Sequence, residues 1–184
     1  MGAWVGDSLG SYLEFETEQF PPETLDLAMS MPGGGCWGVA PGQVTDDSEL
    51  AMCLMRGLIA GGGALNLKEI CRMYGKWANG GIKPFDIGTT TRKTLGLSDP
   101  ENPDPSTPQL AATSVSSQSD GSLMRCMPMA VWCHRLPVEQ VPLATQCDVK
   151  FTHSMPHMAN LISCYTIGIW HLLNGAAERR IQAF

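Results

Sequence analysis

The chain has 184 residues, 43% of them hydrophobic and 16% charged, which suits a single globular domain with its own core. The net charge of -6 disfavours a general binder of nucleic acid or of an anionic membrane, because such partners attract clustered Lys and Arg. The seven cysteines contain no C-x-x-C pair, and neither a signal peptide nor a convincing membrane span is visible, so we expect a cytoplasmic protein without disulfides.

Apolar residues recur mostly at helical spacing along the chain. The clearest helix follows residue 46 and ends at a run of three glycines. Its apolar face is expected to contain Leu50, Leu54, Met55, Leu58 and Ile59. Further helices are expected at about 67–77, 122–134 and 157–173, the last with Leu161, Cys164, Tyr165, Gly168, Ile169 and Leu172 on one side. Short helices joined by polar turns predict an all-α domain.

Two segments rich in Gly or Pro are expected to be irregular. Residues 31–43 lead directly to Thr45, and residues 98–120 have the composition of a mobile surface excursion.

The stretch GQVTDDSEL at 42–50 places three acids at the start of the clearest helix. Asp46 as N-cap and Glu49 three residues later would form an acidic capping box, which needs no ligand. That interpretation leaves Asp47 unexplained. Thr45, Asp46 and Asp47 could instead converge on Mg²⁺, which prefers oxygen ligands.

Four other stretches carry candidate residues, each with an ordinary structural alternative. Asp7 and Glu14 are spaced to share a helix face, or are solvated acids on a packed helix. Asp86 could cap a helix. The tripeptide Asp120-Gly121-Ser122 could form an anion site at a helix start or simply a turn. His153 could contact a ligand, cap a helix or pack in the core.

Five motifs in this order resemble the ADP-ribosylglycohydrolase family, in particular its dinitrogenase-reductase-activating branch. They are GDSLGSYLEF at 6–15, PGQVTDDSELAMCL at 41–54, FDIGTTTRKTL at 85–95, DGSLMRCMP at 120–128 and THS at 152–154. The resemblance implies an all-α, compact, orthogonal multi-helix domain with a dinuclear Mg²⁺ or Mn²⁺ site. Such a domain removes ADP-ribose from modified protein side chains.

The resemblance also implies roles for individual residues. Thr45, Asp46 and Asp47 would be metal ligands, with Glu14 and Asp47 acting in catalysis. The substrate would contact Asp86, Asp120, Gly121, Ser122 and His153, with Asp86 favouring modified arginine. The family usually has Asn where Asp120 stands, and an ionised Asp there would repel the diphosphate.

The family's second metal motif, Asp-x-Asp-Thr, is absent from the sequence, so we expect residues 1–184 to form one incomplete domain, truncated at its C-terminal side. Two ligand carboxylates cannot balance the four positive charges of a metal pair, which predicts a single weak metal site and doubtful activity. The expected partner is an ADP-ribosylated protein or another ADP-ribose derivative. The alternatives are a non-catalytic ADP-ribose binder and a structural, crystallin-like relative, and the oligomeric state stays open.

Overall fold

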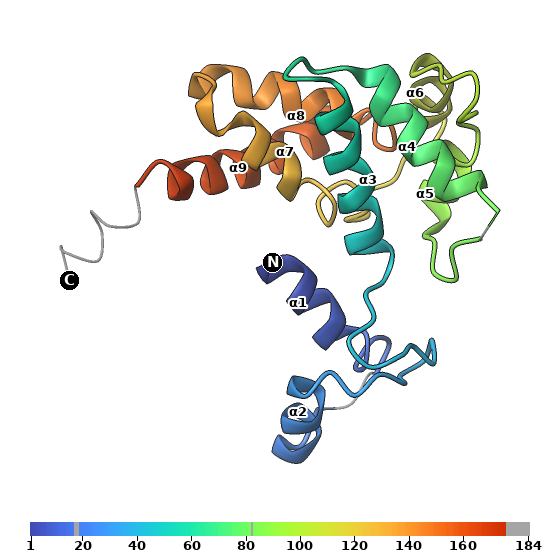
Figure 1. The fold of residues 1–184 in the computed structure, drawn as a ribbon, viewed down its shortest axis with the longest axis vertical. Helices are drawn as coiled ribbons and strands as arrows, with labels where there is room; N and C mark the ends of the chain where they lie inside the picture. The colour runs from blue at the N-terminus through green and yellow to red at the C-terminus, as the bar shows by residue number, and fades with distance from the viewer. Residues whose placement is uncertain (17–18, 82, 176–184) are drawn as a thin grey trace.

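A computed structural model describes residues 1–16, 19–81 and 83–175, and over these ranges the chain is all-α (Figure 1). The helices are α1 (Gly2–Gly10), α2 (Pro22–Met29), α3 (Asp46–Ala60), α4 (Leu67–Asn79), α5 (Thr89–Leu95), α6 (Ser106–Thr113), α7 (Met127–Trp132), α8 (Val141–Val149) and α9 (Pro156–Leu173). Short 3₁₀ turns occupy Cys133–Arg135 and Val138–Gln140. None of the helices in the described ranges combines the length and apolarity needed to span a bilayer.

The centre of the core lies between α3 and α4. Leu50, Leu54 and Leu58 of α3 are buried, as their helical spacing predicts, but Ile59 of the same predicted face is 70% exposed. Gly57 allows the two helices to approach closely, because a Cβ atom at this position would lie only 2.7 Å from the Cα of Ile70. Helices α7 and α8 contribute Met129, Cys133, Val141 and Ala144 to the same cluster.

The last helix is confirmed in extent, but its buried side is not the apolar stripe that its sequence suggests. Leu161, Tyr165 and Leu172 are about half exposed or more, whereas the buried side contains Met158, Ala159, Ile162, Ser163 and Thr166. This side packs on α8.

Two sequence-based boundaries are wrong. Residues 121–125 form turns, and α7 begins only at Met127, where Pro128 is well suited to a first helical turn. The stretch 98–120, expected to be a loop, contains α6, which buries Pro108 and Ala112 and packs against α5. A proline near the start of a helix loses no intrahelical hydrogen bond, so the four prolines before residue 109 do not prevent this helix.

In Figure 1, α1 and α2 lie apart from the main group of helices, and the segment that follows α2 runs back to the start of α3. Residues 31–43 are irregular as predicted, with one isolated antiparallel bridge between Gly34 and Val39. A Cβ on Gly35 would lie 2.5 Å from the carbonyl oxygen of Ser11, so a glycine here lets the loop rest on the end of α1.

Candidate functional site

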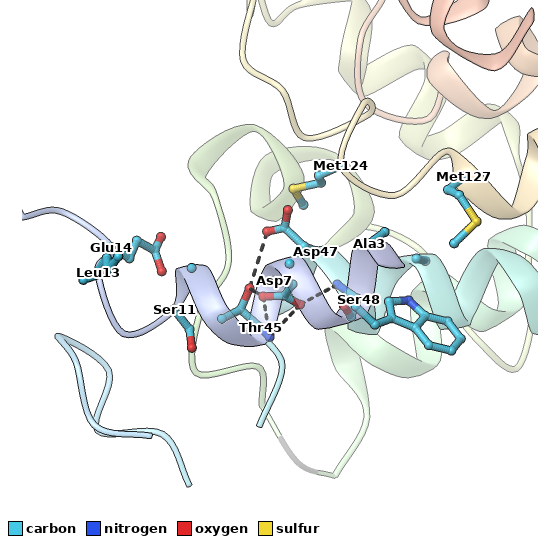
Figure 2. A pocket seen from close by; sticks show the side chains of 14 residues that line it. Ala3, Asp7, Ser11, Leu13, Glu14, Thr45, Asp47, Ser48, Met124 and Met127 are labelled. Atoms are coloured by element: carbon cyan, nitrogen blue, oxygen red, sulfur yellow. Dashed lines mark hydrogen bonds between the residues drawn. The ribbon is translucent and has the colours of Figure 1, made fainter. Parts of the chain in front are cut away.

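The side chain of Asp7 on α1 caps α3 across the space between the two helices (Figure 2). Its carboxylate accepts hydrogen bonds from the backbone N–H of Thr45 at 3.0 Å and of Ser48 at 3.2 Å, and from the Thr45 hydroxyl at 2.7 Å. The N-cap is Thr45, not Asp46, and Glu49 accepts a hydrogen bond from the Trp77 indole at 2.6 Å. The capping box expected from the sequence is therefore wrong, because a distant carboxylate already satisfies the free N–H groups.

Asp46 and Asp86 meet at the start of α3. Asp46 is only 6% exposed. The pKa of Asp46 is raised to about 8, chiefly by burial and in addition by the nearby carboxylates of Asp86, Asp47 and Glu14. Asp46 and Asp86 share a side-chain hydrogen bond, and the pKa of Asp86 is also raised, chiefly by burial. Carboxyl groups this close repel each other unless a proton or a cation neutralises them.

Asp47 lies near the carboxylates of Asp7, Asp120 and Glu14. The pKa of Asp47 is raised to about 6, chiefly by burial and in addition by the charges of Asp7 and Asp120, while the Thr45 hydroxyl opposes the rise. In Figure 2 its carboxylate extends towards Met124, and a long contact of 3.4 Å joins it to the Thr45 hydroxyl. The side chain of Asp47 therefore does not extend into open solvent.

Glu14 follows α1 in a tight turn, not on the helix itself, so the prediction that it shares a helix face with Asp7 is wrong. Both acids nevertheless line one cavity of about 420 Å³, together with Thr45, Asp47 and Ser48 (Figure 2). Burial raises the pKa of Glu14, a hydrogen bond of 2.8 Å from the Trp37 indole opposes that rise, and Asp86 and Asp7 add to it.

The loop with Asp120, Gly121 and Ser122 lies beside His153. The His153 ring is 1% exposed, and its nitrogens bond to the hydroxyls of Ser119 at 3.2 Å and Thr152 at 2.9 Å. Burial and the nearby Arg125 charge lower its pKa to about 4, so the imidazole is neutral at neutral pH. Gly121 and Ser122 are buried while Asp120 is exposed, and the Ser122 hydroxyl has no hydrogen-bond partner.

This loop does not start a helix, because only turns precede α7. The placement of these residues at a helix N-terminus is therefore wrong, and the alternative of a turn is confirmed. Their contact with the substrate stays a prediction.

Arg125 was not among the residues predicted from the sequence, yet its guanidinium holds this loop through the Gly121 carbonyl. The side chain is fully buried and donates to the Gly121 carbonyl, to the Asp148 carboxylate at 3.2 Å and to the Tyr74 hydroxyl at 3.0 Å. Tyr74 in turn donates to Asp148 at 2.6 Å. The position of Arg125 within the motif DGSLMR marks it as a candidate, but its buried partners on α4 and α8 are distant in the sequence.

Acids from four segments thus lie close enough to affect one another's pKa values. Their side chains are not arranged as a set of metal ligands in the described residues. Asp46 and Asp47 interact with Asp7, Glu14, Asp86 and Asp120. Among residues 1–16, 19–81 and 83–175, no three His, Cys, Asp or Glu side chains form a group that could hold a metal ion.

Three curated proteins are similar to this chain over 95% or more of its length. A protein of Acanthamoeba polyphaga mimivirus is 32% identical over 95% of the chain and 54% of its own length. The ADP-ribosyl-[dinitrogen reductase] glycohydrolase of Rhodospirillum rubrum is 31% identical over 95% of this chain and 56% of its own length. The ADP-ribosylarginine hydrolase Tri1 of Pseudomonas putida is 29% identical over 100% of this chain and 48% of its own length. The chain therefore spans about half the length of these curated relatives.

A solved structure described as an ADP-ribosylglycohydrolase-related protein complex has the same fold. It superposes with a TM-score of 0.71 at 24% identity, over 95% of this chain and 54% of the other. The family model for ADP-ribosylglycohydrolase matches residues 1–184, and the chain belongs to this family.

Proposed function

We propose that this chain contributes the ADP-ribose-binding and acidic half of a hydrolase that removes ADP-ribose from modified protein side chains, with arginine favoured. The observation that carries the proposal is the convergence of Asp46, Asp47, Glu14 and Asp86 around the start of α3 in a member of this family. The relatives named for dinitrogen reductase and arginine act on ADP-ribosylated protein, which supports a protein substrate here.

A divalent cation, Mg²⁺ or Mn²⁺, suits the donor set at this site. The oxygens of Thr45, Asp46 and Asp47 would hold it. Such a cation would stabilise the charged forms of the two acids, whose pKa values are raised first by burial and then by neighbouring carboxylates. When bound, the metal would polarise a ribose hydroxyl or a water molecule. Two ligand carboxylates against four positive charges favour one weakly bound ion over a pair.

The chain's own residues would divide the remaining work. Glu14, held by Trp37, would exchange a proton with the reacting groups as the bond at the anomeric carbon breaks, with Asp47 beside it. Asp86 would bind the positively charged guanidinium of a modified arginine. Gly121, Ser122 and neutral His153 would contact the ADP-ribose, with the unpartnered Ser122 hydroxyl available as a donor.

The test measures metal binding and turnover separately on the 184-residue chain. Mn²⁺ is titrated calorimetrically, and release of ADP-ribose is assayed on an arginine-modified peptide. We expect weak metal binding that Asp46→Asn and Asp47→Asn abolish, and turnover far below that of the longer relatives. The exposed Asp26 on α2 offers a matched control, Asp26→Asn, which should change neither measurement. Metal binding that survives both site variants would contradict the proposed ligands.

A non-catalytic ADP-ribose binder is the second candidate, because the described residues do not gather into a ready metal centre. It predicts binding of ADP-ribose that EDTA leaves unchanged, with no release of ADP-ribose in the same assay. A chain that binds neither ADP-ribose nor Mn²⁺ would instead be a structural relative.

A further inference from the structure

Three exposed aromatic side chains from separate segments lie together at the edge of the acidic site. Phe15, Trp37 and Phe85 are 72%, 36% and 40% exposed. The Trp37 ring lies 6.1 Å from each of the two phenylalanine rings, in an edge-to-face arrangement on both sides. Single exposed apolar residues are ordinary on a protein surface, but a contiguous group of large rings marks a contact surface.

Two of the three rings come from constrained segments. Phe15 has a φ of +63°, a left-handed conformation that is a genuine outlier for a bulky residue. Trp37 reaches the cluster from the glycine-rich loop that rests on Ser11 and Tyr12, and its indole is fixed by the hydrogen bond to Glu14.

Carboxylates border the rings on the side of the site. Glu14 precedes Phe15, Asp86 follows Phe85, and Asp86 and Glu14 are close enough that one raises the pKa of the other. Aromatic faces beside carboxylates attract a cation through the ring quadrupole and the negative charges together. Phe85 also borders a hollow lined by Lys76, Lys83 and Glu49. The formal charge of these three side chains is positive, so the side of the cluster beside Glu14 attracts a cation more strongly.

We propose that Phe15, Trp37 and Phe85 form a subsite for an unmodified, positively charged side chain, arginine or lysine, of the protein that carries the ADP-ribose. The proposal rests on the proposed function for the identity of this partner. A nucleobase could also stack on the rings, but its attached diphosphate would face Glu14 and Asp86, and like charges disfavour that arrangement. The subsite would select substrates whose modified residue has a basic neighbour.

The experiment uses unmodified probes, so it does not depend on ADP-ribose release. The blocked tripeptides acetyl-Gly-Arg-Gly-amide and acetyl-Gly-citrulline-Gly-amide are nearly isosteric and differ in charge. Each is titrated to millimolar concentration into the ¹⁵N-labelled 184-residue chain. The reporter is the indole N–H resonance of Trp37, identified by its disappearance in the Trp37→Phe variant.

We expect the arginine peptide to shift this resonance and to bind roughly three- to tenfold more tightly than the citrulline peptide, as a cation–π contact with a nearby carboxylate would give. Phe85→Leu and Phe15→Leu should each weaken the arginine peptide by roughly two- to fivefold. Tyr165→Leu removes a comparably exposed ring, 47% exposed, on α9 and should have no effect.

Equal binding of the two peptides, or no shift at millimolar arginine peptide, would overturn the subsite. A shift caused by adenosine and not by the arginine peptide would overturn it too and would assign the rings to a nucleobase. None of these results would contradict the proposed hydrolase function, because that proposal is tested separately by metal binding and turnover.

Discussion

Asp7 caps the N-terminus of α3, the helix that begins with Asp46 and Asp47. Its carboxylate accepts hydrogen bonds from the backbone N–H groups of Thr45, 38 residues away in the sequence, and of Ser48. Sequence patterns reveal caps that are local, such as the expected pairing of Asp46 with Glu49, and cannot show that a residue of another helix takes this role. With the N–H groups satisfied by Asp7, the carboxylates of Asp46 and Asp47 are left for other partners.

Removing this cap should destabilise the protein. Asp7→Ala leaves two N–H groups of α3 without a charged acceptor, so we expect the free energy of unfolding to fall by about 1–2 kcal/mol. Asp7→Asn retains an acceptor and should lose less. Urea denaturation followed by circular dichroism measures both, with Asp26→Ala on α2 as the control. An unchanged midpoint for Asp7→Ala would show that water replaces the cap at no cost.

Buried His153 should make stability depend on pH. Its pKa is about 4 in the folded protein and 6.5 in the unfolded chain, so the unfolded state binds more protons between these values. The stabilisation is complete above pH 6.5 and is lost as the pH falls towards 4, by up to about 1.4 kcal/mol per unit. Arg125 lowers this pKa and Asp120 opposes the change.

The difference in unfolding free energy between the wild type and His153→Gln isolates this contribution from that of the carboxylates. Urea denaturation between pH 4.5 and 7.5 should show the two curves converging as the pH falls. Parallel curves would mean that His153 titrates alike in the folded and unfolded states. The His153 ring resonances offer a direct check, because they should not titrate near pH 6.5.

At the scale of elements, Arg125 joins the turn at 121–125 to α4 and α8. The guanidinium, the Tyr74 hydroxyl and the Asp148 carboxylate are all buried and hydrogen-bonded to one another. Such a network is costly to break at one member, since the remaining charge stays buried without its partner.

Asp148→Asn should therefore cost about 3–5 kcal/mol, and Tyr74→Phe about 1–2 kcal/mol. Because the two residues share one network, the double variant should lose less than the sum of the single losses. Guanidinium chloride denaturation of all four proteins completes the cycle. Strictly additive losses would show that the two residues act independently and would contradict the network.

The elements themselves could be predicted from sequence where helical spacing is long, as in α3, α4 and α9. Which side of α9 is buried could not be predicted, because apolar residues occupy both sides. The buried Ser163 and Thr166 hydroxyls bond to carbonyls of their own helix, and Thr166 also contacts Thr145 of α8. Polar side chains satisfied in this way can face a core, so polarity alone misplaces the interface.

At the scale of the whole molecule, the five motifs were enough to identify the family, because their order can be read along the sequence. They also named acids that the fold brings near one another, Asp46, Asp47, Glu14 and Asp86. The aromatic cluster and the Arg125 network could not be predicted, since each depends on side chains from three separate segments that only the fold brings together.

The molecule also exposes an apolar groove between α1, α3 and α7. It has a volume of about 470 Å³, and its lining residues are almost all apolar: Met1, Trp4, Met55, Leu58, Ile59, Gly63, Met127, Pro128, Val131 and Trp132. Ile59 is 70% exposed and Val131 45% exposed. Contiguous apolar surface of this kind promotes association in water.

We therefore expect the 184-residue chain to self-associate at micromolar to millimolar concentration, in a manner that Ile59→Lys and Val131→Lys each weaken. A lysine placed in the groove would bury its charge at the contact, at a cost of about 1–3 kcal/mol and hence roughly a five- to hundredfold weaker association. Sedimentation velocity across a concentration series measures this. Leu110→Lys alters an equally exposed residue, 72% exposed on α6 and outside the groove, and should leave association unchanged. If all three variants and the wild type sediment as monomers at the highest concentration, then this apolar surface is stable in water by itself.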